Sequence, residues 1–302
     1  MDRRGLLAGL GATGLLACSR APAQAEVEAT TGPPAAEPPR FDPLDLSDLE
    51  TAHGGRLGFV FHAVDRGLGL SWRGDERFVY CSTFKLFLAA AVLEKVEAGA
   101  ERLDRLVAMT QADLLSHAPV TEPAVGSFLT IERLCQAAVE VSDNPAANIL
   151  MREMGGLEAM RIWYRSIGDQ DTRVDRWEME LNVPDGDKDT IRPHQAVRNL
   201  QAVLLTDDGS VLDEVNRERL TGWLVASPSG PRRIRAGTPE GWTVAHKTGT
   251  ASGGVNDIGL LTTQDGEPFL VAAYFDGEAG APVERGEAAI AEAVRRAIEV
   301  FS

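Results

Sequence analysis

The chain has 302 residues, with 30 lysines and arginines against 45 aspartates and glutamates, and a formal net charge of −15 at pH 7. This length is sufficient for one large domain or two modest ones with an ample core. The acidic balance argues against nucleic acid and against anionic membrane surfaces as partners. It does not exclude an anionic small molecule, because a local group of lysines and arginines can override the overall charge.

Residues 1–25 have the pattern of an export signal. Arg3 and Arg4 precede a run of Gly, Ala and Leu that is too short to cross a bilayer as a helix. The Leu-Leu-Ala-Cys sequence ending at Cys18 resembles a bacterial lipobox, and the paired arginines resemble a weak twin-arginine signal. Cleavage after Ala25 is the alternative. We expect an exported, periplasmic protein, and the Pro/Ala-rich linker at residues 26–40 favours a membrane tether through a lipidated Cys18.

The next elements alternate in type along the chain. Residues 41–54 are predicted to be helical, and residues 56–64 and 68–72 form two strands around an Asp-Arg-Gly turn. The apolar run 86–93, closed by Gly99, indicates a helix that is buried on nearly all sides. The pattern then stays mostly helical to about residue 222.

Strands return near the C-terminus. One begins at Trp242, and residues 258–263 and 269–275 flank a Gln-Asp-Gly-Glu-Pro segment typical of a hairpin. The last element is an amphipathic helix with an apolar stripe formed by Ile290, Val294, Ala297, Ile298 and Phe301.

This order predicts a two-lobed α+β fold. Residues 41–81 and 223–302 would form one antiparallel sheet with flanking helices, and residues 82–222 would form an inserted helical lobe. A cleft between two such lobes is a usual place for a binding site. Cys81 and Cys135 are most simply two buried free thiols, although an oxidising compartment allows a disulfide. The five histidines show no paired ligand spacing, so we expect no metal.

Three short motifs carry chemistry. Ser82-Thr83-Phe84-Lys85 places a hydroxyl and an amine three residues apart at the start of the buried helix, on one helix face, so the Lys85 amine should reach the Ser82 hydroxyl. The helix start also offers free N–H groups and a positive dipole end. Ser-Asp-Asn follows at 142–144, and Lys-Thr-Gly-Thr at 247–250 ends a predicted strand, where a glycine allows a ligand to approach closely.

In this order, Ser-x-x-Lys, Ser-Asp-Asn and Lys-Thr-Gly are the signature of class A β-lactamases and penicillin-binding proteins. A fourth motif, Arg-Trp-Glu-Met-Glu-Leu-Asn at 176–182, resembles the glutamate-bearing Ω-loop of class A enzymes, which transpeptidases lack. The chain from Phe41 to Ser302 therefore resembles the class A serine β-lactamases. The resemblance implies resistance to antibiotics through hydrolysis of the β-lactam amide, by a monomer that needs no cofactor.

The resemblance implies a catalytic set of Ser82, Lys85, Ser142, Glu178 and Lys247. Ser82 would attack the lactam carbonyl and form an acyl-enzyme, Ser142 would relay a proton to the leaving nitrogen, and Glu178 would activate the water that releases the acyl group. Either Lys85 or Glu178 would be the base for acylation.

The implied substrate-binding set comprises Asn144, Asn182, Thr248, Thr250, Arg233 and His117. Asn144 would bind the amide of the substrate's side chain, and Asn182 would hold the hydrolytic water with Glu178. The backbone N–H groups of Ser82 and Thr250 would form the oxyanion hole.

The remaining implied residues bind the substrate carboxylate or hold loops. Thr248 would face the carboxylate with Lys247, assisted by Arg233, for which Arg232 and Arg235 are competitors. His117 occupies the place of an aromatic gate, or is simply an exposed loop residue. Asp143 would orient its loop, and an ion pair of Arg176 with Asp189 would close the neck of the Ω-loop at 176–189.

The chain departs from the family pattern at three places. Met179 stands where proline usually follows the Ω-loop glutamate, so the peptide is either cis or trans with Glu178 displaced. The loop is also slightly short between Asn182 and Asp189. Ala251 stands where some carbapenem-hydrolysing relatives have a cysteine, so Cys81 cannot form that disulfide. Preference among penicillins, cephalosporins and carbapenems stays open.

Two other functions compete with β-lactam hydrolysis. A D-alanyl-D-alanine peptidase or transpeptidase would acylate Ser82 but release the product slowly, and the presence of Glu178 and Asn182 argues against it. A silent lipoprotein that binds cell-wall fragments is disfavoured by the complete set of catalytic side chains.

Overall fold

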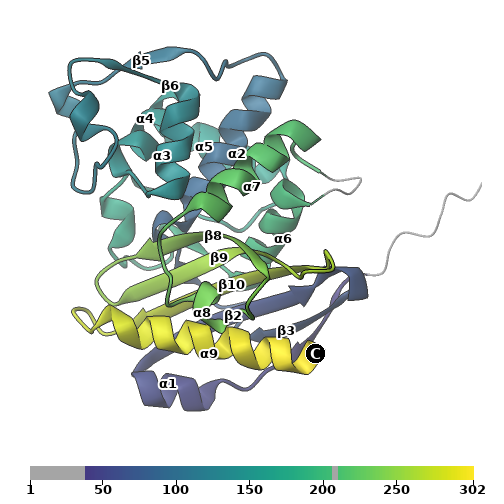
Figure 1. Ribbon diagram of the computed structural model, residues 1–302. Coiled ribbons are helices and arrows are strands. Elements are labelled where there is room, and N and C mark those ends of the chain that lie inside the picture. Colours follow the sequence, from purple (N-terminus) through teal and green to yellow (C-terminus); the bar gives the residue numbers. More distant parts are fainter. Residues whose placement is uncertain (1–37, 206–209) are drawn as a thin grey trace, which may run out of the picture. The chain divides into compact units, whose positions relative to one another are not determined.

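The computed structural model describes residues 38–205 and 210–302 (Figure 1). The predicted export signal at 1–25, with Cys18, and most of the predicted linker at 26–40 lie outside the described residues. The linker ends earlier than expected, because a strand already begins at Arg40. Within the described ranges, no helix combines the length and apolar character needed to span a bilayer.

A six-stranded sheet is built from both ends of the described chain, as predicted. Its order is β1-β3-β2-β10-β9-β8, and all pairs are antiparallel except β1 with β3. The strands are β1 (Arg40–Pro43), β2 (Gly55–Ala63), β3 (Leu68–Trp72), β8 (Thr243–Thr250), β9 (Gly254–Thr262) and β10 (Pro268–Gly277). Since β2 pairs with β10 over nine residues, the two ends of the chain meet in the middle of the sheet.

One face of the sheet is covered by helices near the chain ends. Figure 1 shows the C-terminal helix α9 (Val283–Phe301) lying across this face, with α1 (Ser47–His53) and the short α8 (Ile234–Gly237) beside it. The predicted stripe of α9 is confirmed, because Ile290, Val294, Ala297 and Ile298 are buried in the core beneath it.

The other face of the sheet contacts α6 (Pro193–Leu204), which packs on β2 and β10. The remaining helices are α2 (Phe84–Glu97), α3 (Ile131–Glu140), α4 (Asn144–Met154), α5 (Gly156–Ser166) and α7 (Glu214–Ala226). The inserted segment also contains short strands: β5 (Leu106–Ala108) pairs with β6 (Phe128–Thr130), and β7 (Thr190–Ile191) pairs with β4 (Phe78–Val79). The proposed lobe boundary at 222–223 falls inside α7.

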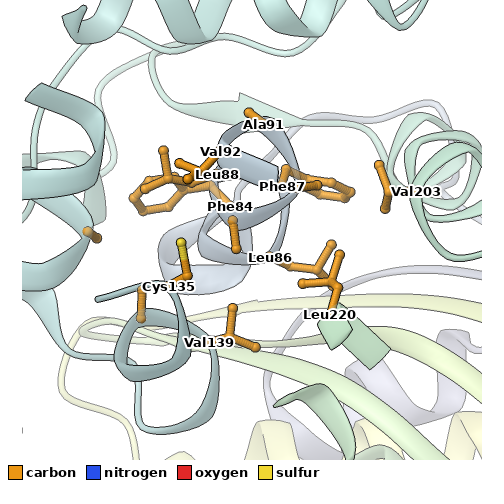
Figure 2. Packing of buried hydrophobic residues seen from close by; sticks show 14 of the residues in the cluster. Phe84, Leu86, Phe87, Leu88, Ala91, Val92, Cys135, Val139, Val203 and Leu220 are labelled. Atoms are coloured by element: carbon orange, nitrogen blue, oxygen red, sulfur yellow. The ribbon is translucent and has the colours of Figure 1, made fainter. Parts of the chain in front are cut away.

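Helix α2 forms the centre of the inserted segment. Its ten residues from Phe84 to Leu93 are all buried, and it contacts α3, α4, α5, α6 and α7. In Figure 2, Phe87 and Leu86 point from α2 toward Val203 and Leu220, while Cys135 and Val139 of α3 lie close to the same helix. The prediction of a helix buried on nearly all sides is confirmed, because a helix with this many neighbours needs no polar face.

The predicted helix at 41–54 is only partly correct. Its first residues form β1, which pairs with β3, and the helix begins at Ser47. Pro43 explains the difference, because proline has no N–H to donate within a helix and disfavours a helical conformation for the residue before it.

Candidate active site

The candidate nucleophile lies in a tight turn before α2. Ser82 is the middle residue of a 3₁₀ turn (Cys81–Thr83), and α2 begins at Phe84, so the serine lies just before the start of the long helix. The preceding residue, Cys81, has a φ of 48°, which is uncommon for a non-glycine residue. His117 and Ser142, which also border the site, have φ of 60° and 59°. Such conformations persist where the surrounding structure holds them, often at functional sites.

Lys85 is completely buried and is held by three partners. Its amine donates to the backbone oxygen of Ser142 at 2.9 Å and to Asn144 Oδ1 at 2.5 Å, and it forms an ion pair with Glu178 Oε1 at 3.0 Å. The expected direct bond to Ser82 is not among the contacts of the described residues. Burial lowers the pKa of the Lys85 amine, and the carboxylate of Glu178 opposes this shift.

Glu178 connects the lysine with the nucleophile. Its Oε1 accepts a hydrogen bond from Ser82 Oγ at 3.4 Å, and its Oε2 accepts one from Asn182 Nδ2 at 2.7 Å. The peptide bond between Glu178 and Met179 is cis, which answers the question left open by the missing proline.

Asn148 of α4 fixes the backbone of Glu178, and sequence reasoning missed this residue. Its Nδ2 donates to the Glu178 carbonyl at 2.9 Å, and its Oδ1 accepts from the Glu178 N–H at 3.0 Å. Asn148 follows Asn144 by one helical turn, so both asparagines can face the same loop. The spacing of four residues between Asn144 and Asn148 is the sequence feature that could have indicated this contact.

Ser142 lies between two lysines. Its Oγ is 3.1 Å from Lys247 Nζ and 3.4 Å from Lys85 Nζ. Burial strongly lowers the pKa of the Lys247 amine, and the nearby charge of Lys85 lowers it further. Because both amines donate to the Ser142 oxygen, the hydroxyl hydrogen is left to point elsewhere.

Asp143 is a structural residue, as expected. Its carboxylate accepts bonds from the N–H groups of Val120 and Thr121, from the Thr121 hydroxyl, and from the Ala146 N–H, which makes it the N-cap of α4. The preceding loop carries His117, which is exposed and whose Nε2 contacts the Val141 carbonyl at 2.7 Å.

Of the three candidate arginines, Arg233 is the one whose guanidinium contacts Gly249 and Thr250 of the Lys-Thr-Gly-Thr motif. Its guanidinium donates to the carbonyls of Gly249 and Asn256 and to Thr250 Oγ1 at 2.8 Å. Glu287 of α9 binds its Nε at 3.3 Å, and sequence reasoning missed this residue because it lies 54 positions away. The competing arginines have other partners: Arg232 pairs with Glu287 and Glu284, and Arg235 contacts His246.

Gly249 allows β8 to approach the nucleophile turn. A side chain on this residue would lie 3.0 Å from the Tyr80 carbonyl and 3.1 Å from the Ser82 nitrogen. A glycine at this position therefore favours the close packing of the two backbone segments, one of which carries the Ser82 N–H. The sequence had indicated approach of a ligand instead.

The neck of the Ω-loop is closed by the expected ion pair. Arg176 Nε is 2.6 Å from Asp189 Oδ2, and the Tyr80 hydroxyl donates to Asp189 Oδ1 at 3.2 Å. The same carboxylate accepts from the N–H groups of Asp175 and Arg176. Asp189 thus ties the loop that carries Glu178 to the residue two positions before Ser82.

These groups border a cleft of about 590 Å³. The candidate residues in its lining are Ser82, His117, Ser142, Asn144, Asn182, Arg233, Thr248 and Thr250. Lys85, Glu178 and Lys247 are buried. Both described cysteines are free and buried, and burial raises the pKa of the Cys81 thiol to about 12.

Comparison with known proteins identifies the family. The model of the β-lactamase enzyme family matches residues 44–301, which is most of the chain. The chain belongs to this family, as a class A serine β-lactamase with the α+β fold of that class.

Named relatives and solved structures agree with this assignment. The chain is 40% identical to β-lactamase FAR-1 of Nocardia farcinica (strain IFM 10152) over 76% of this chain and 73% of that protein. It is 37% identical to β-lactamase AST-1 of Nocardia asteroides over 99% and 96%. An ancestral class A β-lactamase (GNCA) has 43% identity and a TM-score of 0.81, over 85% of this chain and 98% of that one. A β-lactamase from Streptosporangium roseum has 37% identity and a TM-score of 0.80, over 85% and 96%.

Proposed function

We propose that this protein hydrolyses the β-lactam amide of penicillin- or cephalosporin-type antibiotics through an acyl-Ser82 intermediate, and so confers resistance to them. The observation that carries the proposal is the convergence of a hydroxyl, a buried amine and a buried carboxylate at one end of the cleft. Ser82 Oγ donates to Glu178 Oε1, and Glu178 is paired with Lys85. A serine hydroxyl needs such a neighbouring base to act as a nucleophile.

In acylation, the Ser82 oxygen bonds to the lactam carbonyl carbon while Lys85 or Glu178 accepts its proton. The C–N bond then breaks, and the lactam nitrogen receives a proton through Ser142. The Ser142 hydroxyl suits this role because two lysine amines occupy its oxygen. The N–H groups of Ser82 and Thr250 stabilise the oxyanion, where loss of one donor typically costs about 2.7–4 kcal/mol.

In deacylation, a water molecule loses a proton to Glu178 and bonds to the acyl carbon, and the ester bond to Ser82 breaks with return of a proton to the serine. Asn182 supports this step by holding Glu178 Oε2 at 2.7 Å. General-base help of this kind is typically worth roughly 10²–10⁴-fold in rate.

The substrate carboxylate is bound along β8. Thr248 and Thr250 line the cleft on β8, with the amine of Lys247 at 2.8 Å from the Thr248 carbonyl and the guanidinium of Arg233 against Thr250. Asn144 binds the amide of the substrate's side chain, and His117 packs on the substrate at the rim.

Two further proposals concern the whole protein. It acts as a monomer, which rests on the resemblance of the chain to class A β-lactamases. It is exported to the periplasm and tethered through Cys18, which rests on the lipobox-like sequence.

Turnover of a chromogenic cephalosporin by the purified protein tests the proposed function. We expect steady hydrolysis by the wild-type protein and its loss in Ser82→Ala. A burst of acylation without steady turnover would favour the D-alanyl-D-alanine peptidase instead. Rapid turnover by Ser82→Ala would contradict the proposal.

A further inference from the structure

Met179 places a thioether on the wall of the cleft. Its side chain is 41% exposed and lines the same cleft as Ser82 and Asn144. The sulfur accepts two hydrogen bonds, one from Ser116 Oγ at 2.9 Å and one from Asn144 Nδ2 at 3.1 Å. Such an exposed methionine, held at its sulfur by two donors, has a defined position in the site.

The orientation of the Asn144 amide is fixed by its other partners. The amine of Lys85 points at one end of the amide, and the Ser116 carbonyl, which can only accept, lies 2.8 Å from the other. The oxygen must therefore face Lys85 and the nitrogen must face Ser116. Asn144 is also 94% buried by its surroundings, with an exposed fraction of only 6%.

Both hydrogens of the Asn144 nitrogen are therefore already used. One is donated to the Ser116 carbonyl and the other to the sulfur of Met179. An amide nitrogen carries two donors, so none remains for a ligand. A carbonyl group entering the cleft can bind Asn144 only by displacing one of these two acceptors.

The sulfur is the acceptor that yields. A thioether is a weak acceptor, whereas an amide carbonyl is a strong one. Met179 is also partly exposed and has a flexible side chain, while the Ser116 carbonyl belongs to the backbone. Replacing the sulfur by a substrate carbonyl as the acceptor is therefore favourable. The binding free energy gained is reduced, however, because the hydrogen bond from Asn144 to the Met179 sulfur must first be broken.

We propose that Met179 is a specificity-determining residue that competes, through its sulfur, with the acylamino carbonyl of a β-lactam side chain for the Asn144 N–H. This inference rests on the proposed function, since it assigns the Asn144 amide to substrate binding. The competition should affect only the β-lactams whose side chain offers a carbonyl to Asn144. Met179 weakens the binding of β-lactams that carry an acylamino group relative to those that lack one.

The test compares two penicillins with the same nucleus. Benzylpenicillin carries an acylamino group, and 6-aminopenicillanic acid carries a free amine at that position. In Met179→Leu, which keeps the volume but removes the acceptor, we expect the ratio of kcat/KM for benzylpenicillin over 6-aminopenicillanic acid to rise roughly three- to tenfold, as for one net hydrogen bond. The change should appear in KM. Met179→Ala should move the ratio in the same direction.

Controls separate this effect from general ones. Met160→Leu makes the same chemical change at a methionine that is fully buried in α5, away from the cleft, and should leave the ratio at its wild-type value. In the Ser82→Ala background, titration measures penicillin binding without chemistry, and Met179→Leu should tighten benzylpenicillin by a similar factor.

An unchanged ratio in both Met179 variants, or an equal change for both penicillins, would overturn the inference. Failure of the wild-type protein to acylate Ser82 with either penicillin would instead overturn the proposed function. The binding titration would still decide the role of Met179 in that case.

Discussion

Replacement of Glu178 by glutamine tests the step that distinguishes a β-lactamase from an enzyme that acylates and stops. The substitution keeps the size of the side chain but removes its charge. One carboxylate oxygen faces the donors of Lys85 and Ser82, and the other faces Asn182 Nδ2. A glutamine can keep its oxygen toward Lys85 if the Asn182 amide rotates, because Asn182 Oδ1 is buried without a partner among the described residues.

The substitution removes an ion pair and a general base. The charges of Lys85 and Glu178 are 3.0 Å apart, so their attraction at an effective dielectric constant of about 20 is on the order of 5–6 kcal/mol. Desolvation of the two ions offsets several kcal/mol of this. Loss of the general base should slow deacylation by roughly 10²–10⁴-fold. Removal of the carboxylate also lowers the pKa of Lys85 further, since Glu178 opposes the lowering caused by burial.

The assay combines mass spectrometry with stopped-flow kinetics. We expect Glu178→Gln to accumulate a covalent benzylpenicillin adduct on Ser82, while steady turnover falls. The rate of the initial burst measures acylation separately. If Lys85 is the base for acylation, the burst should persist to lower pH than in the wild type, because a lysine of lower pKa is neutral at lower pH. Glu180→Gln is the matched control, since Glu180 is exposed and lies two residues along the same loop.

Wild-type turnover in Glu178→Gln would refute the assignment of the deacylation base. Loss of both adduct and turnover in a folded variant would instead identify Glu178 as the base for acylation, because the acyl-enzyme would then fail to form without its carboxylate.

Three further predictions follow from single contacts. Glu287→Ala frees Arg233 from its partner on α9, and KM for benzylpenicillin should rise roughly tenfold with a smaller change in kcat; an unchanged KM would contradict this. Asp143→Ala removes an acceptor of four hydrogen bonds, and chemical denaturation should show a loss of about 2–5 kcal/mol. Burial lowers the pKa of His62, so the unfolded chain binds more protons in acid; stability should fall as pH drops below about 6.5, and less so in His62→Leu.

The sequence was sufficient for the parts of the site that short motifs define. The Ser-x-x-Lys, Ser-Asp-Asn and Lys-Thr-Gly segments meet at one cleft, and the helix after Ser82 is buried on nearly all sides as its composition indicated. The sheet built from both chain ends also followed from the order of strands and helices.

The contacts between distant segments could not be read in the same way. Glu287 lies on α9, and the apolar stripe of α9 predicts which face of the helix is buried. That pattern does not indicate that Glu287 binds Arg233, which is on another element. The i to i+3 spacing placed Lys85 within reach of Ser82, but Ser142, Asn144 and Glu178 supply the acceptors instead, and they come from segments distant in the sequence. The helical spacing between Asn144 and Asn148 could have indicated that Asn148 faces the same side of α4. It could not show that the Ω-loop packs on that side, which is the contact that gives Asn148 its role.

The strand order has a consequence for biosynthesis. β8, which carries Lys247, pairs with β9, β9 pairs with β10, and β10 pairs with β2. Among the described residues, β8, the strand proposed to bind the substrate carboxylate, is thus joined in the sheet to β2 and β3 only through β9 and β10. A nascent chain that ends before Pro268 lacks β10, and therefore lacks the pairing that joins β8 and β9 to β2. Such non-local pairing is also slow to form. We therefore expect activity to appear only after synthesis has passed β10.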